Sequence, residues 1–214
     1  MNKITALRAG KGRSKRVNIF LDGGFAFSLE AEVAVKEGLK VEQELPAERI
    51  KALAESDDLQ RCFNAASLLL SYRLRSEPEL RQRLRRRGFA DTTVDNTILK
   101  LREKGLVDDA AFARFWKENR DYFSPRSRSL TRLELKRKGV AEDIIERVVE
   151  DIDDEDNAYR AGVKKARSLS RSDYRQFRRR LGDHLRRRGF NYGVINSTVN
   201  RLWQEQDEKI KQES

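Results

Sequence analysis

A unit of about fifty residues occurs three times in this chain, and this repetition limits the possible folds more than any other feature. Gly88, Gly139 and Gly189 lie 51 and 50 residues apart, and each follows three consecutive cations. A leucine stands four positions before each glycine, and apolar residues recur at three fixed distances after it. These recurring residues are Val94, Ile145 and Ile195, then Ile98, Val149 and Val199, then Leu101, Ile152 and Leu202. Such self-similarity indicates a tandem array whose units stack on their neighbours.

Each repeat is predicted to hold three helices, so a mainly α fold is expected. The glycine fits a helix C-terminus, where a left-handed residue ends the helix and the next apolar side chain packs back on it. Ser76-Glu77-Pro78-Glu79 has the spacing of a capping box at a helix start. Acidic pairs precede the predicted first helix of each repeat, where carboxylates can accept free backbone N–H groups. These pairs are Asp57-Asp58, Asp108-Asp109 and Asp153-Asp154.

The N-terminal part of the chain has the alternating pattern of short strands. Asp22-Gly23-Gly24 separates two such segments and predicts a β-hairpin, because tight hairpin turns favour glycine. The expected strands cover residues 4–9, 17–21 and 25–29, and the expected short helices cover 30–37 and 46–55. The expected division of the chain is a β-rich N-terminal unit with short helices (1–58), then repeat one (59–108), repeat two (109–153) and repeat three (154–214).

Several side chains in the repeats are expected to be buried. Cys62 lies in the apolar helical stretch 59–70 and is predicted to be a small core residue rather than a nucleophile. Phe112, Phe115 and Trp116 follow the spacing of one helix face, which places them in the core of repeat two.

No arrangement of residues indicates catalysis, a metal site or a cofactor. His184 and Cys62 are the sole histidine and cysteine, so a zinc cluster and an intramolecular disulfide are excluded. Phosphate-loop and nucleophile-elbow motifs are absent from the sequence. There is no apolar run of about 18 residues and no apolar segment of a signal peptide at the start. We therefore expect a cytoplasmic, monomeric protein without enzymatic activity, cofactor or membrane contact.

The net positive charge is concentrated in two of the repeats. The whole chain has a formal charge of +11, and residues 1–58 contribute none of it. Residues 59–108 carry +5, residues 109–153 are neutral and residues 154–214 carry +6. One or two cations in a last helical turn are explained by the helix dipole, but three in a row are not. This excess favours a polyanionic partner over a merely soluble basic surface: nucleic acid first, then an acidic protein surface or a membrane.

The candidate contacts with this partner are fourteen cations in and around the three basic runs. They are Arg81, Arg83, Arg85, Arg86 and Arg87 in repeat one, Lys136, Arg137 and Lys138 in repeat two, and Arg178, Arg179, Arg180, Arg186, Arg187 and Arg188 in repeat three. Repeats one and three are expected to face the polyanion, with repeat two as a spacer or a protein contact. Tyr122 and Phe123 precede a loop where an exposed ring could touch a base or a partner. No aromatic series resembles a base-stacking platform.

Five segments of the repeats are together specific enough to indicate a family. They are Arg75-Ser76-Glu77, Leu84-Arg85-Arg86-Arg87-Gly88-Phe89, Lys104-Gly105-Leu106-Val107-Asp108-Asp109, Glu134-Leu135-Lys136-Arg137-Lys138-Gly139-Val140 and Leu185-Arg186-Arg187-Arg188-Gly189-Phe190. In these segments the chain resembles the RecX family of recombination regulators, and residues 18–27 resemble an extension that some members carry. One departure is Thr131, which stands where the other repeats have Leu80 and Leu181, so the middle helix is expected to shift and use Leu130 or Leu133.

The resemblance implies three three-helix repeats in an elongated, bent array behind a small β-hairpin-containing unit. It also implies binding to the RecA recombinase filament on DNA and inhibition of RecA ATP hydrolysis, strand exchange and co-protease activity, with a role in DNA repair and the SOS response. Contact with single- or double-stranded DNA is expected to be weak and directed to the backbone. Two alternatives remain open: a stand-alone basic helical DNA-binding protein acting through phosphate contacts, and a protein scaffold whose basic runs meet only acidic protein.

Overall fold

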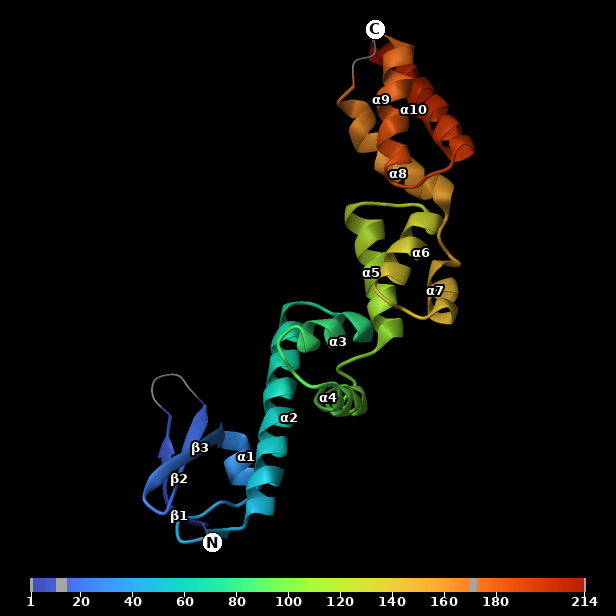
Figure 1. The fold of residues 1–214 in the computed structure, drawn as a ribbon. Helices are drawn as coiled ribbons and strands as arrows, with labels where there is room; N and C mark the ends of the chain where they lie inside the picture. The colour runs from blue at the N-terminus through green and yellow to red at the C-terminus, as the bar shows by residue number, and fades with distance from the viewer. Residues whose placement is uncertain (1, 11–14, 170–172, 214) are drawn as a thin grey trace. The chain divides into compact units, whose positions relative to one another are not determined.

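The computed structural model describes residues 2–10, 15–169 and 173–213, which form four strands and ten helices (Figure 1). The chain divides into two compact units. The first unit consists of Met1–Leu74 and Leu80–Val107, and the second of Arg75–Glu79 and Asp108–Ser214. The predicted mainly α fold is confirmed. In the described part of the chain, every helix is too short or too polar to span a bilayer.

The strands form one antiparallel sheet in the order β3-β2-β1-β4. Their bounds are Asn2–Ala9 for β1, Arg16–Leu21 for β2, Gly24–Glu30 for β3 and Glu44–Leu45 for β4. The predicted hairpin joins β2 to β3, and both turn residues, Asp22 and Gly23, have positive φ angles of 48° and 86°. Strand β4 was not predicted, because two residues are too short to show an alternating pattern.

Two helices lie beside this sheet: α1 (Ala31–Lys36) and the N-terminal half of α2 (Ala47–Tyr72) (Figure 1). The buried residues between them are Ile4, Ile19, Leu29, Val33, Leu39, Leu45 and Leu53. Helix α2 continues through the expected boundary between residues 58 and 59, where we predicted two separate helices. Residues 47–72 contain no glycine or proline, so nothing in the sequence ends the helix there. Asp57-Asp58 therefore lies within a helix, and its predicted role as a helix start is wrong.

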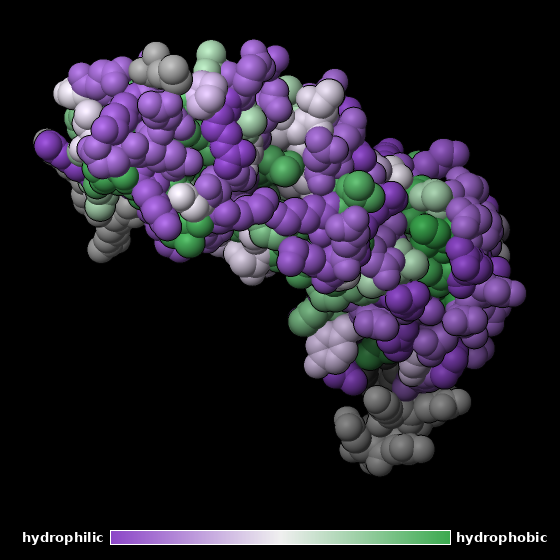
Figure 2. Space-filling view, turned by 90° about the horizontal axis from the view of Figure 1, so that it is seen from below, coloured by the Kyte–Doolittle hydropathy of each residue, from purple (hydrophilic) through white to green (hydrophobic). Residues whose placement is uncertain are grey.

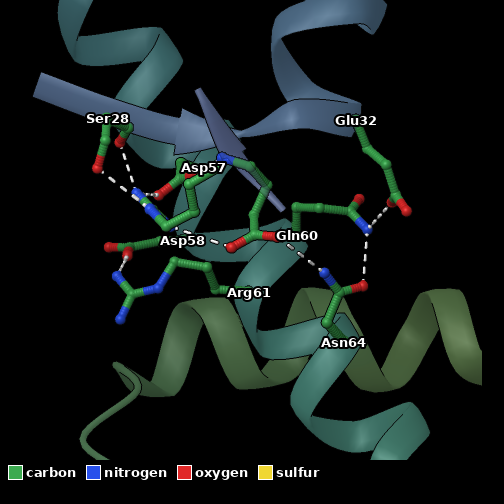
Figure 3. Close-up of polar contacts among 9 residues, drawn as sticks. Ser28, Glu32, Asp57, Asp58, Gln60, Arg61 and Asn64 are labelled. Carbon is green, nitrogen blue, oxygen red and sulfur yellow. Dashed lines mark hydrogen bonds and ion pairs between the residues drawn. The ribbon is translucent and has the colours of Figure 1, made fainter. Parts of the chain in front are cut away.

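Asp57 instead fixes α2 to the sheet (Figure 3). Its buried carboxylate accepts a hydrogen bond from the backbone N–H of Glu30 at 2.6 Å and pairs with the Arg16 guanidinium at 3.0 Å. Arg16 also donates to the Ser28 hydroxyl at 3.1 Å. One turn further along α2, the Gln60 amide donates to Glu32 at 2.6 Å. Both oxygens of the buried carboxylate thus have partners, and both partners come from the strands β2 and β3.

Each repeat contains the three helices that the sequence predicts. Repeat one uses the C-terminal half of α2 with α3 (Glu77–Arg85) and α4 (Asp91–Glu103). Repeat two contains α5 (Asp109–Phe123), α6 (Arg128–Arg137) and α7 (Glu142–Val149). Repeat three contains α8 (Asp154–Arg167), α9 (Tyr174–Arg186) and α10 (Tyr192–Glu213). The three repeat glycines have φ angles of 88°, 77° and 86°, which confirms their left-handed conformation.

The helix starts and cores agree with the sequence at most positions. Asp108 and Asp153 cap α5 and α8 by accepting two backbone N–H groups each, as predicted. Cys62 and Phe112 are buried, but Phe115 is 41% exposed, so its predicted core position is wrong. The α5 helix turns its apolar face toward α6 and α7 through Phe112 and leaves Phe115 at the edge.

The middle repeat keeps its helix in register despite the missing leucine. Thr131 is buried at the position of Leu80 and Leu181, and Leu133 is 41% exposed. The predicted shift of this helix is therefore wrong. A threonine still presents a methyl group to the core, and the neighbouring Leu130 packs against the turn of Gly189 instead.

Candidate functional site

The fourteen predicted contact residues divide into free and engaged side chains. Six of the fourteen are exposed arginines with neither an ion pair nor a side-chain hydrogen bond to another described residue: Arg86, Arg87, Arg137, Arg179, Arg180 and Arg187. The remaining eight are held by neighbouring residues, Arg83 among them. Figure 2 shows one face of the molecule, on which hydrophilic residues predominate and hydrophobic ones form small separate groups. The free arginines are the ones that can contact a partner without first breaking an internal ion pair.

In repeat one, the basic run is partly neutralised from within. Arg81 pairs with Asp95, and Arg85 pairs with Asp91 at 2.6 Å, so both guanidinium groups are held against α4. Arg86 and Arg87 follow at the turn that ends α3, and no acidic side chain neutralises them in the described residues. The available charge of this run is therefore concentrated at its C-terminal end.

In repeat two, the basic run forms a junction with the start of α3. The Lys138 ammonium lies 3.5 Å from the Glu79 carboxylate and 5.1 Å from the centre of the Trp116 ring. Its backbone carbonyl accepts a hydrogen bond from the buried Ser76 hydroxyl at 2.6 Å. Lys136 pairs more loosely with Glu142, at 3.7 Å. Of this run, only Lys138 therefore has a clear structural role, while Lys136 is loosely paired and Arg137 is free.

The junction of repeat three with repeat two has a similar construction, with a backbone N–H in place of the serine hydroxyl as donor. The backbone carbonyl of Arg188 accepts a hydrogen bond from the backbone N–H of the buried Ser127 at 3.0 Å. A Cβ atom on Gly189 would lie 2.5 Å from the Ser127 hydroxyl oxygen, and one on Gly139 would lie 2.6 Å from the Pro78 ring. At Gly88 nothing lies within 4 Å of the same position. We call these two contacts, Gly139 on the start of α3 and Gly189 on the start of α6, the repeat junctions.

Repeat three has a basic hollow of about 360 Å³ between α9 and α10, which we call the repeat-three groove. Its lining consists of Arg175, Arg178, Arg179, Gly182, Asp183, Arg186, Tyr192, Ile195, Asn196 and Val199. The groove brings together three predicted contacts, Arg178, Arg179 and Arg186. Arg180, Arg187 and Arg188 do not line it. The other lining residues were not predicted, because only a comparison of equivalent positions across the repeats would have singled them out.

A second basic hollow of about 360 Å³ lies beside α8 and is called the α8 hollow here. Its lining consists of Phe123, Ser124, Pro125, Arg160, Ala161, Lys164, Lys165, Ser168, His184 and Arg188. Tyr122 and Phe123 are 80% and 73% exposed, with their rings 4.7 Å apart in a T-shaped pair. The exposed ring and the lysines combine a stacking surface with phosphate-binding cations. Lys164 and Lys165 were not predicted, because they follow no basic run.

Arg188 is half-buried, unlike its neighbours in the run. Burial lowers its pKa, and the charge of Arg187 lowers it further. Its Nε atom has no hydrogen-bond partner among the described residues. The pKa of Arg126 is lowered as well, first by burial and then by the charges of Arg120 and Arg188. Arg188 thus belongs to a group of crowded cations inside the second unit and is not a freely exposed contact.

The neutral form of His184 suits its surroundings in the α8 hollow. Nε2 lies 3.2 Å from the carbonyl oxygen of Ala161, and Nδ1 lies 3.5 Å from an Arg188 nitrogen. With its proton on Nε2, the ring donates to the carbonyl and accepts from the arginine. Burial lowers the pKa of His184, and the positive charge of Arg188 lowers it further.

We expect His184 to make the second unit less stable in mild acid. Its folded-state pKa lies below the value of about 6.5 for an unfolded chain, so the unfolded state takes up the proton first as the pH falls. The contribution is present above about pH 6.5 and is lost below it. Between about pH 7.5 and 5.5, the urea midpoint of the wild type should fall more than that of His184→Gln, whose amide can still donate to Ala161. Equal falls in the two proteins would contradict this role.

The fold and its surfaces define a basic helical-repeat protein, with a strand-containing unit ahead of three three-helix repeats. The residues that the structure describes include no group of three or more potential metal ligands. Four family models match the chain. They are the regulatory protein RecX N-terminal domain over residues 2–46 and the first, second and third three-helix domains of RecX over residues 62–101, 108–149 and 153–199. The chain belongs to the RecX family of regulatory proteins.

Individual relatives agree with this assignment over nearly the whole chain. Regulatory protein RecX of Clostridium perfringens strain SM101 is 32% identical over 207 residues, which cover 94% of this chain and 97% of the relative. Regulatory protein RecX of Bacillus velezensis is 31% identical, covering 99% of this chain and 81% of the relative. A crystal structure of regulatory protein RecX has the same fold, with a TM-score of 0.69 at 24% identity over 94% of this chain. RecX from Lactobacillus salivarius matches 69% of this chain with a TM-score of 0.58 and 26% identity.

Proposed function

We propose that this protein binds the RecA–DNA filament and inhibits RecA ATP hydrolysis, strand exchange and co-protease activity, acting as a cytoplasmic monomer. Family membership supports a regulatory role. The structural observation behind the proposal is the set of exposed arginines without ion-pair partners in the described residues. Arg86 and Arg87 lie in repeat one, and Arg179, Arg180 and Arg187 lie in repeat three.

Free cations on the surface suit a partner that presents many negative charges. Each contact with a phosphate releases a counterion, so DNA binding weakens steeply with salt. A contact with acidic protein side chains depends on salt mainly through the association rate. Either kind of contact fits a filament of protein on DNA, and neither requires catalysis by this chain.

The test is ATP hydrolysis by RecA on single-stranded DNA while this protein is titrated in. The wild type is expected to inhibit hydrolysis. Arg86→Glu/Arg87→Glu and Arg180→Glu/Arg187→Glu should each raise the concentration needed for half inhibition at least about tenfold, because each reverses two free charges. These four side chains are exposed and lie outside the repeat junctions, so the helical content should not change.

The control is Arg114→Glu/Arg147→Glu, which makes the same change in net charge on exposed residues of the neutral repeat two. This variant should inhibit RecA about as well as the wild type. If the control loses inhibition to the same extent, net charge alone explains the effect and the assigned surfaces are wrong. If the wild type leaves RecA hydrolysis unaffected, the proposed function itself is wrong.

The α8 hollow favours one alternative, a protein that acts by binding DNA alone. An exposed aromatic beside Lys164 and Lys165 can contact both a base and its phosphates. Binding of a labelled single-stranded oligonucleotide without RecA distinguishes the two functions. Tight, salt-sensitive binding that is lost in Lys164→Glu/Lys165→Glu, together with unaffected RecA hydrolysis, would favour the DNA-binding protein.

A further inference from the structure

In repeats one and two, two ion pairs join the second helix to the third at equivalent positions. The first pair joins the residue seven positions before the repeat glycine to the residue seven positions after it. This pair is Arg81 with Asp95 in repeat one and Arg132 with Glu146 in repeat two. The second pair joins the residues three positions before and three positions after the glycine. It is Arg85 with Asp91 at 2.6 Å in repeat one and Lys136 with Glu142 at 3.7 Å in repeat two. The third helix therefore supplies two carboxylates, four residues apart, that neutralise the second helix.

Repeat three lacks both carboxylates. The equivalent positions hold Asn196 and Tyr192, and the arginine seven residues before the glycine is replaced by Gly182. Arg186 stands at the position of Arg85 and Lys136, which pair with the third helix of their repeats. Without a carboxylate at the equivalent position of α10, Arg186 instead forms an ion pair with Asp183 on its own helix, at 2.6 Å. Arg178 reaches across instead and donates to the neutral oxygens of Tyr192 and Asn196, at 3.1 Å and 3.2 Å. The missing side chain of Gly182 and the missing carboxylates leave the repeat-three groove open and positively charged.

The groove also offers an apolar surface beneath its charged rim. Ile195 is half-buried at the side of α10, and a Cβ atom on Gly182 would be 3.6 Å from it. Val199, the other apolar lining residue, is fully buried and adds no exposed surface. Four arginines and a single carboxylate surround this surface. Arg175 and Arg179 are exposed and have no ion pair with any described residue. The groove can therefore accept an apolar side chain that is flanked by anionic groups.

We propose that the repeat-three groove binds an acidic amphipathic helix of a partner protein, whose carboxylates replace the two that repeat three lacks. In the other two repeats, the cations of the second helix pair with two carboxylates of the third helix that lie four residues apart, about one helical turn. An amphipathic helix presents the same spacing, with apolar residues at intervening positions that can pack on Ile195. A nucleic acid strand shares the negative charge but lacks this spacing. The inference does not depend on RecA.

The probe is a labelled helical peptide with glutamates at i and i+4 and leucines on the adjoining face. A second peptide has glutamine in place of each glutamate, and a single-stranded oligonucleotide serves as the nucleic acid. Full-length protein should bind the glutamate peptide at least about tenfold more tightly than the glutamine peptide, because Arg–carboxylate contacts are charge-assisted. The difference should shrink as salt is raised. Equal binding of the two peptides, or no binding of either, overturns the proposal.

Two variants restore the carboxylates that repeat three lacks. Tyr192→Glu places a carboxylate beside Arg186 on an exposed position and should weaken the glutamate peptide at least about fivefold. Tyr192→Gln removes the same hydroxyl without adding charge and should have a smaller effect.

Gly182→Arg/Asn196→Asp rebuilds the ion pair of repeat one across the groove and should abolish peptide binding while keeping the helical content. Unchanged peptide binding in both carboxylate variants rules out the groove. If these variants lose only oligonucleotide binding, the groove is a nucleic acid site and the peptide assignment is wrong.

Discussion

Replacing Gly139 by alanine is expected to destabilise the second unit by about 2–5 kcal/mol. The residue has a φ of 77°, and an L-residue in the left-handed region costs roughly 1–2 kcal/mol. Its Cβ would also lie 2.6 Å from the Pro78 ring, and such overpacking adds about 1–3 kcal/mol. A proline ring cannot rotate away, so the start of α3 must move. Urea unfolding followed by tryptophan fluorescence measures this loss, because both tryptophans, Trp116 and Trp203, belong to the second unit.

Gly88→Ala is the matched control for this variant. Gly88 ends the same turn with a φ of 88°, but nothing lies within 4 Å of its Cβ position. We expect only the conformational cost of about 1–2 kcal/mol, seen by far-UV circular dichroism as a change in the first unit. The tryptophan transition should stay where it is. Equal losses in the two variants would mean that backbone conformation alone determines the effect and that the repeat junction contributes nothing.

Replacing Glu134 by glutamine is expected to cost the second unit about 2 kcal/mol. Its carboxylate is 12% exposed, accepts from the indole N–H of Trp116 and from Arg120, both at 2.9 Å, and also pairs with Arg126. Removing one partner of a fully buried ion pair costs about 3–5 kcal/mol, because the remaining charge stays without compensation. The two arginines are 25% and 28% exposed, so water screens part of their uncompensated charge. We therefore expect a loss of about 2 kcal/mol instead of the loss for a fully buried pair.

The comparison for Glu134→Gln is Glu142→Gln on the surface of the same repeat. Glu142 lies 3.7 Å from Lys136, and both side chains are more than half exposed. An exposed pair of this kind contributes under about 1 kcal/mol, so the urea midpoint should hardly move. The difference between the two variants isolates the effect of burial. A small effect of Glu134→Gln would indicate that the neighbouring cations move apart without cost.

The sequence predicts the repeat fold well because the same signals occur three times. The glycines that end α3, α6 and α9 could be identified from their spacing, and their left-handed conformation follows from the absence of a side chain. Helix α2 could not be predicted as one element, because Asp57 looks like a helix start in sequence. Its true partners, Arg16 and the backbone of Glu30, come from strands far away in the chain.

The candidate site was less predictable than the fold, since a run of cations in sequence says nothing about their partners. Lys138 and Arg188 belong to the predicted basic runs, but their carbonyl groups form the repeat junctions. Arg178, Arg179 and Arg186 do meet in one groove. What sets that groove apart is the absence of acids at Tyr192 and Asn196, and an absence becomes visible only when α10 is compared with α4 and α7.

The repeat junctions give the succession of repeats a direction, because the two sides of a junction are different. A junction joins a buried serine at the start of a helix in the earlier repeat to the glycine turn of the later repeat. Ser76 and Gly139 form one such junction, and Ser127 and Gly189 form the other. Repeat two contains both halves, whereas the glycine turn of repeat one faces open space. A tandem duplication of residues 109–153 would therefore provide every complementary surface that a further module requires. The number of repeats in such a chain can therefore increase by copying repeat two. Repeat one can stand only at the start, because its glycine turn does not contact a preceding repeat.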